Sequence, residues 1–481
     1  MGAESREYHA RHRKGDRLAS RGRHEDAIRH YDAAIRMDPK IGYAHGAKGA
    51  SLRSLGRYEE AIGCLDEALG VEPESVSAHK IKGECLIRLG RHGEALECFD
   101  EAIRLEPTSE KAHYAKGMCL LNMDMPRDAI VCLDESLRIG PKSAEAYHAK
   151  GICLDLLDRP GDAIRHYNAA LRINPGFKEA YDRKGAALIR AKKYRSAIKS
   201  FNSSLRLDSG DAGAHKNKAE CLYELGRYGD AARCIDEALR LNPGDAEAHL
   251  IRGHCLYMDN GESDALDCYS EALDIDPNYA DAHAGQGDCL FAMGLDAEAA
   301  ECYSEALRID PNYTGALLGK AGCLRAMSKY GEAAECYSEA LRIDPEDRDA
   351  HHLRGHCLYR LGRYGEAMEC LDEALRIDPE YVAAHLDRGG CLSKMGEHGE
   401  AARCYGEAAR IDPKDWTSHY KKGTAHLSLG EYDAALKCLR EAERIDPKDE
   451  ALHYKKGIAH AMLGERGEAE RCLKEALRLD G

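Results

Sequence analysis

Apolar residues recur along the chain with gaps of three and four positions, the spacing of one face of an α-helix rather than the alternation of a β-strand. In every stretch of 34 residues this pattern occurs twice, with a breaker near the middle and, in most stretches, Asp-Pro or a similar turn at the end. The central breaker is usually glycine, as at Gly22, a residue that tolerates the left-handed conformation ending a helix. The pattern therefore predicts helices of about thirteen residues joined in pairs by tight turns.

The register of these pairs holds through the chain. Twelve of the fourteen prolines lie on one comb with a spacing of 34, which defines fourteen repeats over residues 8–481 after a lead of residues 1–7, the last repeat being two residues short. Alanine occupies the Ala27 position in all fourteen repeats, and glycine occupies the Gly15 position in twelve. Such small side chains let helices approach closely. Because neither helix of a pair can bury its apolar face alone, we expect the hairpins to stack into a solenoid.

The period of 34 and the columns that begin at Gly15, Ala27, Tyr31, Ala34 and Pro39 resemble the tetratricopeptide repeat. This resemblance covers residues 8–481 and implies an all-α, right-handed superhelical solenoid of about fourteen hairpins, whose first helices line a concave groove. It also implies a non-catalytic scaffold that holds peptide segments or partner proteins. The Lys-Gly pair in the first helix is similar to that of archaeal, methanogen-type arrays, and occurs for example at Lys48-Gly49, Lys116-Gly117 and Lys456-Gly457.

Net charge and missing motifs exclude several functions. The chain carries 69 Lys and Arg against 84 Asp and Glu, a formal charge of −15, which argues against general binding of nucleic acids or anionic membranes. It has no signal-peptide pattern, and no apolar run approaches the length of a membrane helix. Gly-rich phosphate loops, Gly-x-Ser-x-Gly and His-Glu-x-x-His motifs are absent. We therefore expect a soluble, cytoplasmic protein that is not an enzyme and needs no cofactor.

Two columns that the family pattern assigns to the groove carry candidate binding residues. The first is an aromatic ladder with one arginine, and the second lies beside it: Tyr223, Tyr257, Phe291, Arg325 and Tyr359, with Glu220, His254, Asp288 and His356. Residues 259–313 hold fourteen acids and a single base, Arg308. Acids steer a basic segment inward and rings supply binding hot spots, so we expect a basic or amphipathic peptide as the partner. Alternatively, these acids point outward and keep a long solenoid soluble.

All twenty cysteines fall in two columns. Nine lie in the first helices and eleven in the second: Cys85, Cys119, Cys153, Cys221, Cys255, Cys289, Cys323, Cys357 and Cys391; then Cys64, Cys98, Cys132, Cys234, Cys268, Cys302, Cys336, Cys370, Cys404, Cys438 and Cys472. Buried packing thiols are the favoured interpretation. Disulfides would need an oxidising compartment, and a zinc or iron–sulfur site would need closely spaced ligand pairs such as Cys-x-x-Cys, which is absent.

Histidine and basic residues form two further columns. Ten histidines occupy the first-helix position where the family favours an aromatic ring: His45, His79, His113, His215, His249, His283, His351, His385, His419 and His453. Packing in place of that ring is the favoured interpretation, over metal binding or pH sensing. His352 and His356 could share a metal ion, but two ligands are a weak indication, and we predict no metal site. The position before Gly15 is Lys or Arg in thirteen repeats; we expect these heads to reach neighbouring acids rather than a partner.

Two segments depart from the average repeat. The sixth repeat, residues 178–211, lacks cysteine and proline and has nine bases against four acids. It is either a joint between two parts of the array, a separate contact for an anionic partner, or ordinary sequence drift. The last repeat ends with apolar Leu473 and Leu477 and no further helix, an incomplete cap for a solenoid. This motivates an alternative function, in which the protein is a structural unit that forms homo-oligomers through its C-terminal end.

Overall fold

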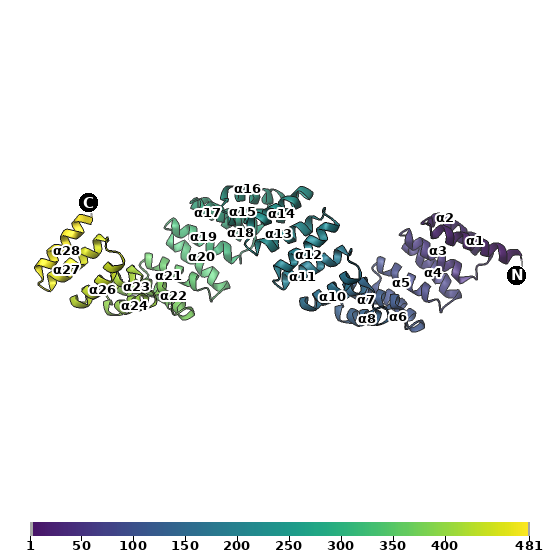
Figure 1. The fold of residues 1–481 in the computed structure, drawn as a ribbon, viewed down its shortest axis with the longest axis horizontal. Coiled ribbons are helices and arrows are strands. Elements are labelled where there is room, and N and C mark those ends of the chain that lie inside the picture. Colours follow the sequence, from purple (N-terminus) through teal and green to yellow (C-terminus); the bar gives the residue numbers. More distant parts are fainter. Residues whose placement is uncertain (1–2, 480–481) are drawn as a thin grey trace. The chain divides into compact units, whose positions relative to one another are not determined.

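The computed structural model describes the backbone of residues 3–479, and these form twenty-eight α-helices and no strand (Figure 1). Consecutive helices pair into fourteen hairpins, as the hydrophobic pattern predicts. Each hairpin also packs against the next along the chain within each compact unit. None of the helices in this part of the chain combines the length and apolar character needed to cross a bilayer.

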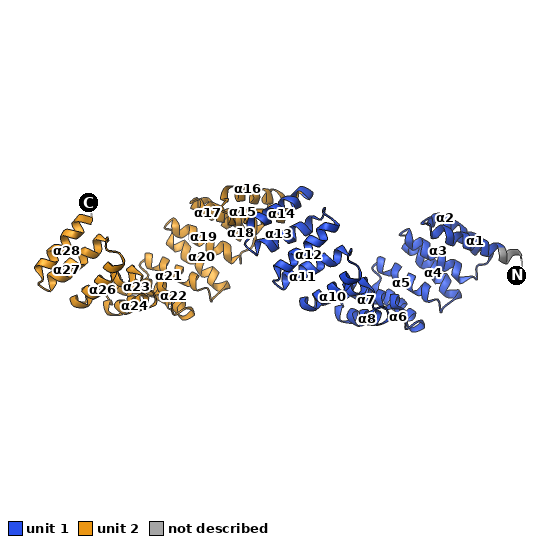
Figure 2. Cartoon of the chain, viewed as in Figure 1, with its two compact units in different colours: residues 1–242 blue, residues 243–481 orange. Residues whose placement is uncertain are grey.

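The chain divides into two compact units at Asn242 and Pro243, with seven hairpins in each (Figure 2). The helices of the unit of residues 1–242, hereafter the N-terminal unit, are α1 (Ala3–Ala19), α2 (His24–Met37), α3 (Gly42–Ser54), α4 (Tyr58–Val71), α5 (Val76–Arg88), α6 (His92–Leu105), α7 (Glu110–Asn122), α8 (Pro126–Ile139), α9 (Ala144–Leu156), α10 (Pro160–Ile173), α11 (Lys178–Arg190), α12 (Tyr194–Leu207), α13 (Ala212–Tyr223) and α14 (Tyr228–Leu241). Helix α1 includes residues 3–7 of the lead that the repeat register sets apart.

The unit of residues 243–481, hereafter the C-terminal unit, has the same alternation of first and second helices. They are α15 (Ala246–Met258), α16 (Glu262–Ile275), α17 (Ala280–Ala292), α18 (Asp296–Ile309), α19 (Thr314–Ala326), α20 (Tyr330–Ile343), α21 (Arg348–Arg360), α22 (Tyr364–Ile377), α23 (Val382–Lys394), α24 (His398–Ile411), α25 (Trp416–Ser428), α26 (Tyr432–Ile445), α27 (Glu450–Met462) and α28 (Arg466–Leu479).

Small residues in register let the two helices of a hairpin touch. Ala27 is fully buried, and the same holds for the alanines in register with it along nearly the whole array. A Cβ atom built on Gly151 would lie 2.5 Å from Cε1 of Tyr167, a ring that is itself fully buried on the second helix of that hairpin. The aromatic ring therefore occupies the space that the missing side chain leaves, and this pairing of large with small residues explains the glycine column.

The turn inside each hairpin contains one residue in the left-handed conformation, as the breaker column predicts. Gly22 has φ of 75°, and Asp124, Asp158 and Asn260 adopt the same conformation where glycine is missing. Lys192 and Ser328 also adopt it, with φ of 53° and 61°. Residue type alone does not predict these last two, because neither lysine nor serine favours positive φ. The packing of the flanking helices imposes the turn on them.

The histidine column has a structural role that goes beyond filling the place of an aromatic ring. In all ten positions Nε2 lies within hydrogen-bond distance of the backbone carbonyl six residues earlier, as His351 Nε2 does at 3.1 Å from the carbonyl of Pro345. Because a carbonyl only accepts, Nε2–H is the donor. Each imidazole thus ties the first helix of a repeat to the turn that precedes it, and satisfies a backbone carbonyl of that turn.

All twenty cysteines are free thiols that are buried or half-buried. Burial raises the pKa of these thiols, for example that of Cys85 to about 11 and that of Cys289 to about 12. Their arrangement agrees with the packing interpretation and with no disulfide. They behave as small apolar residues of the core.

Candidate peptide-binding surface

Four of the five ladder residues lie at the ends of consecutive first helices in the C-terminal unit. Tyr257 belongs to α15, Phe291 to α17, Arg325 to α19 and Tyr359 to α21. Helix α15 contacts α17, and α17 contacts α19. Tyr223 belongs to α13 of the N-terminal unit, where its ring packs edge-on against Tyr228 at 5.3 Å between centroids.

Two of the rings lie over a glycine on the next first helix. A Cβ atom on Gly322 would lie 3.8 Å from Cζ of Phe291, and one on Gly390 would lie 3.6 Å from Cε2 of Tyr359. Phe291 remains 39% exposed, although it is a phenylalanine. Each ring therefore packs at van der Waals distance from the place where a side chain of the glycine would begin. Gly322 and Gly390 were not identified from the sequence as part of this surface. Each glycine directly precedes a cysteine of the first-helix column and lies 31 residues after the aromatic residue that it contacts, and this spacing could have indicated it.

Asp288 and His254 give the surface its polar groups. The hydroxyl of Tyr303 donates a hydrogen bond of 2.6 Å to Oδ1 of Asp288. Partial burial raises the pKa of Asp288, and the Tyr303 hydroxyl and His254 oppose that effect. Burial lowers the pKa of His254, so this imidazole is neutral at physiological pH, and it packs edge-on against Tyr269. Asp288 also lies close enough to Tyr257 to raise the pKa of that phenol, although burial contributes more.

The remaining predicted residues are occupied by contacts within the protein. Arg325 lies against the phenol of buried Tyr337 and opposes the rise that burial causes in its pKa. His356 Nδ1 and His352 Nε2 lie 3.1 and 3.0 Å from the same carboxylate oxygen of Asp387 on α23. These two imidazoles hold the pKa of Asp387 below its ordinary value against the effect of burial. Within the described residues, no cluster of three or more His, Cys, Asp and Glu side chains is arranged to hold a metal ion.

Glu220 lies on α13 of the N-terminal unit, one residue before Cys221, and its side chain is exposed. It raises the pKa of the Cys221 thiol, although burial contributes more. Glu220 and Tyr223 both belong to α13 of the N-terminal unit, whereas the other ladder residues belong to the C-terminal unit.

The acids of residues 259–313 are distributed unevenly over the helices. Nine of the fourteen lie on α16 and α18, which are second helices and carry none of the ladder residues. Asp281 and Asp288 lie on the first helix α17. Most of these acids are exposed. The acidic excess therefore lies mainly on second helices, and Asp288 and Glu262 are the acids of this segment that lie close enough to Tyr257 to raise the pKa of its phenol.

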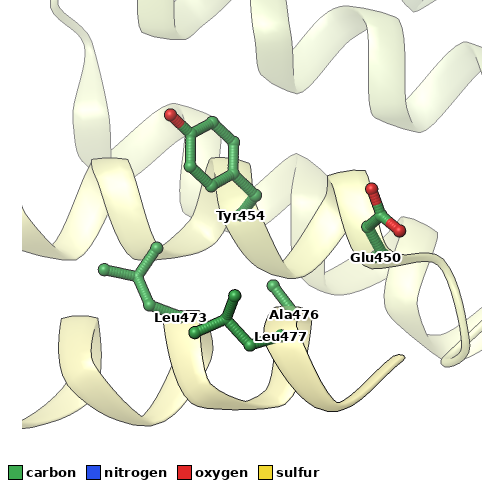
Figure 3. A pocket seen from close by; sticks show the side chains of 5 residues that line it. All are labelled: Glu450, Tyr454, Leu473, Ala476 and Leu477. Atoms are coloured by element: carbon green, nitrogen blue, oxygen red, sulfur yellow. The ribbon is translucent and has the colours of Figure 1, made fainter. Parts of the chain in front are cut away.

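A second surface lies on the last described hairpin. Glu450, Tyr454, Leu473, Ala476 and Leu477 line a hollow of about 320 Å³ between α27 and α28 (Figure 3). Leu477 is 73% exposed and Tyr454 is 52% exposed. In Figure 3, Leu473, Ala476 and Leu477 extend from α28 toward α27, whereas Tyr454 and Glu450 of α27 extend away from α28 in this view.

Comparison with known families identifies the repeats. One model described as a tetratricopeptide repeat matches residues 12–67, 47–110, 262–314 and 324–382. A second of the same description matches residues 86–151, 188–255 and 358–427, and a third matches residues 144–177. A model described as a TPR repeat matches residues 423–464. The matches are to the general repeat, so an archaeal origin of the Lys-Gly pattern stays a prediction.

Solved structures with a similar chain trace are distant in sequence. The APC/C hetero-tetramer Cut9-Hcn1 shares 17% identity, with 100% of this chain and 94% of that chain covered and a TM-score of 0.37. Naa15/Naa10 bound to HypK-THB shares 15% identity, with 98% and 99% covered and a TM-score of 0.36. YrrB, titled a TPR protein with an unusual peptide-binding site, shares 23% identity, with 38% and 95% covered and a TM-score of 0.35. No curated protein matches the chain.

The family matches together extend over most of the chain and follow the helical hairpins of the structure. Arrays of this kind are generally non-catalytic. The chain belongs to the tetratricopeptide repeat family and is an array of the type that serves as a protein–protein interaction scaffold.

Proposed function

We propose that the C-terminal unit binds a peptide segment of a partner protein on the surface formed by Tyr257, Phe291 and Tyr359, hereafter the aromatic cluster. The observation that carries this proposal is the exposed ring of Phe291, which lies over Gly322, a residue that has no side chain to cover the ring. Exposed aromatic rings on a rigid helical surface are typical binding hot spots. Asp288 beside the rings favours a basic side chain in the partner.

Selection of displayed peptides against the full chain tests the proposal. We expect selected sequences to combine aromatic or aliphatic residues with Lys or Arg. Tyr257→Ala with Phe291→Ala should weaken a selected peptide by about tenfold or more, because hot-spot truncations cost about 2 kcal/mol or more. Ile275→Ala with Ile343→Ala is the matched control, since both side chains are partly exposed on second helices. Unchanged affinity of the first variant, or selection of acidic peptides, would refute the proposal.

A second candidate function is self-association through the hollow of the last hairpin. It is supported by the exposed apolar side chains of Leu477 and Tyr454. Sedimentation of the wild-type chain should then show a dimer whose population rises with concentration. Leu477→Glu should abolish that dimer, whereas Leu429→Glu, at another exposed leucine, should leave it intact. A monomer at all concentrations would contradict this function.

We further propose that the protein works in the cytoplasm. The support is that none of the twenty cysteines, all of which lie in the described part of the chain, forms a disulfide, a state that reducing compartments maintain. Fractionation of cells followed by detection of the protein tests this location, and recovery from an oxidising compartment would contradict it.

A further inference from the structure

In repeats two to five, the lysine directly before the glycine in register with Gly15 forms an ion pair with an acid of the preceding repeat. Lys48 Nζ lies 2.6 Å from Oδ1 of Asp32, and Lys82 Nζ lies 2.6 Å from Oδ1 of Asp66. Lys116 pairs with Asp100 and Lys150 with Asp134 in the same way. The acid is always 16 residues earlier, on the second helix of the preceding hairpin. This confirms for these repeats that the basic heads reach neighbouring acids.

The next junction keeps the lysine and loses the acid. Lys184 stands on α11 in the position of Lys150, but the residue 16 places earlier is Asn168. No ion pair of Lys184 occurs among the residues that the structure describes. Burial lowers the pKa of Lys184. Burial acts in the same direction on Lys48, but the hydrogen bond with Asp32 and the nearby acids outweigh it, so the pKa of Lys48 is raised. A half-buried ammonium group without a counter-ion is therefore present at this junction.

A second acid is missing from the same place. In other repeats one acid in the first turn of the second helix pairs with a basic residue three positions before it, and often with another three positions after it; Asp230 pairs in this way with Arg227 and Arg233. In the sixth repeat the corresponding residue is Ser196, and its two basic neighbours are Lys193 and Lys199. Both lysines are exposed, and in the described part of the chain neither has an ion pair.

Asn168 and Ser196, the two residues that stand where other repeats carry acids, line the same hollow of about 440 Å³ between α10, α11 and α12. Lys184, Lys193 and Lys199 line it together with Asn168 and Ser196, and no carboxylate is among the residues that line it. The equivalent hollow one repeat later has a similar size but includes Asp230 and Glu237. These two acids are paired with arginines. The hollow of the sixth repeat thus has no acid to offset its lysines, whereas the hollow one repeat later has two acids beside its basic residues, although Lys218 there also faces an asparagine, Asn202.

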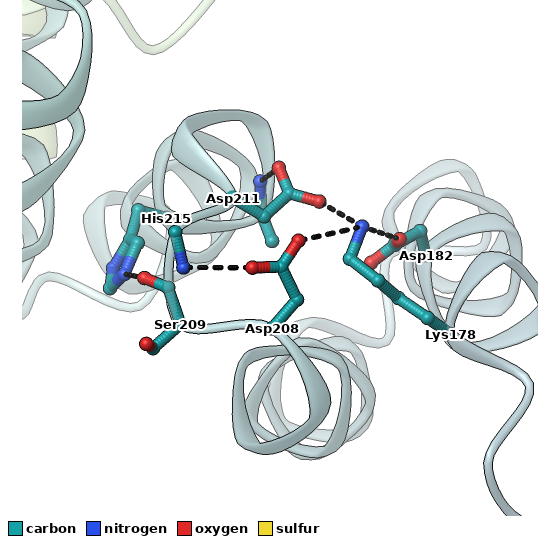
Figure 4. A network of polar contacts seen from close by, with 8 residues as sticks. Lys178, Asp182, Asp208, Ser209, Asp211 and His215 are labelled. Atoms are coloured by element: carbon teal, nitrogen blue, oxygen red, sulfur yellow. Dashed lines mark hydrogen bonds and ion pairs between the residues drawn. The ribbon is translucent and has the colours of Figure 1, made fainter.

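Another lysine of α11 shows that the basic character of this repeat is not uniform. Lys178 Nζ lies 3.2 Å from Asp182 and 3.9 Å from Asp208, and it also pairs with Asp211 (Figure 4). This ion-pair network joins α11 to the turn before α13. In the described part of the chain, four lysines of this repeat have no ion pair, and three of them, Lys184, Lys193 and Lys199, line the hollow.

We propose that this hollow is a binding site for an oxyanion carried by an acidic segment of a partner protein, either the carboxylate of glutamate or the phosphoryl group of phosphoserine. Three ammonium groups supply the charge, and the Asn168 amide and Ser196 hydroxyl supply further donors. Ile164, Tyr181 and Leu188 also line the hollow, so it accommodates an apolar side-chain stem as well as its charged end. The site lies in the N-terminal unit and does not depend on the aromatic cluster.

Restoring the missing acids tests this site without altering the fold, since other repeats carry acids at both positions. The probes are fluorescein-labelled octaglutamate and a phosphoserine peptide of equal charge, measured by fluorescence anisotropy with the full chain at low salt. Asn168→Asp with Ser196→Asp should weaken binding by about tenfold, the loss expected for one hydrogen bond to a charged group. Asn174→Asp with Asn242→Asp makes the same change in net charge at two turn positions where other repeats have aspartate, and should leave binding within about twofold.

Lysine variants provide an independent arm. Lys184→Gln should weaken both probes, whereas Lys150→Gln, at the same position one repeat earlier, should not, because Asp134 already neutralises Lys150. Tighter binding of the phosphoserine peptide than of octaglutamate assigns the phosphoryl group as the ligand, and the reverse assigns the carboxylate. Absence of binding to both probes would overturn the proposal. Equal loss in the control variants, or tighter binding of a single-stranded RNA that the Lys184→Gln variant also loses, would overturn it as well.

Discussion

The nine cysteines of the first helices should be the least reactive thiols of the protein. Alkylation by iodoacetamide requires the thiolate, and burial raises the pKa of several of these thiols to about 11 or 12. Those of the second helices also have raised pKa values, but a neighbouring Lys or Arg opposes the rise in most of them, as Lys48 does for Cys64. The two columns should therefore label at different rates.

The expected difference follows from the pKa values. At about pH 8 a thiol of ordinary pKa, about 8.5, is roughly one quarter ionised, whereas one of pKa 11 is ionised to about one part in a thousand. The thiolate fraction of the buried cysteine is therefore about 200-fold smaller. A more basic thiolate is intrinsically more nucleophilic, by about tenfold over this range, which leaves a net reduction of about twentyfold. Complete burial of Cys85 and Cys289 slows the reaction further, because the reagent must wait for local opening.

Pulsed labelling with peptide mass spectrometry measures these rates for each cysteine. In the native protein the first-helix cysteines should label at least about twentyfold more slowly than free cysteine. The second-helix cysteines should label faster than the first-helix cysteines. After denaturation without reductant, all twenty should label at one rate. Fast native labelling of the first-helix column would refute the packing interpretation. Fewer than twenty thiols after denaturation would indicate disulfides, and protection that a chelator removes would indicate a metal site.

Three further predictions concern stability. The buried thiols have higher pKa values in the folded protein than in the unfolded chain, so their full contribution to the free energy of unfolding is present below about pH 8. This free energy should fall as the pH rises toward 11, by about 1.4 kcal/mol per pH unit for each such thiol. Urea unfolding at two pH values measures the loss, and equal midpoints would contradict it. Phe201→Ala removes a fully buried ring and should cost about 3 to 5 kcal/mol, seen as faster hydrogen exchange in α11 and α12 before other helices respond. His351→Phe keeps a ring but loses the bond to the carbonyl of Pro345, and should cost about 1 kcal/mol in urea unfolding; a variant as stable as the wild type would show that only packing matters there.

The candidate surfaces could be predicted only in part. The columns correctly indicate which residues lie on first helices, because helical periodicity fixes the face of each residue within its own helix. They do not indicate that His356 lies within hydrogen-bond distance of Asp387, or that the exposed ring of Phe291 lies over Gly322. Those contacts join residues about one repeat apart. They depend on how two hairpins stack and which rotamers fit between them, and neither can be derived from residue type alone.

The sequence by itself determined the hairpin repeat, the helix boundaries and most left-handed turn residues, because these depend on interactions between residues a few positions apart. Glycine, proline and the spacing of apolar residues are sufficient for that. Tertiary structure decided how the polar side chains pair, from the histidine bonds to the preceding turns to the acids that Lys48 and Lys150 meet 16 residues earlier. The physical reason is that a charged group's state depends on the partner that packing brings to it, and Lys184 differs from Lys150 only in that partner.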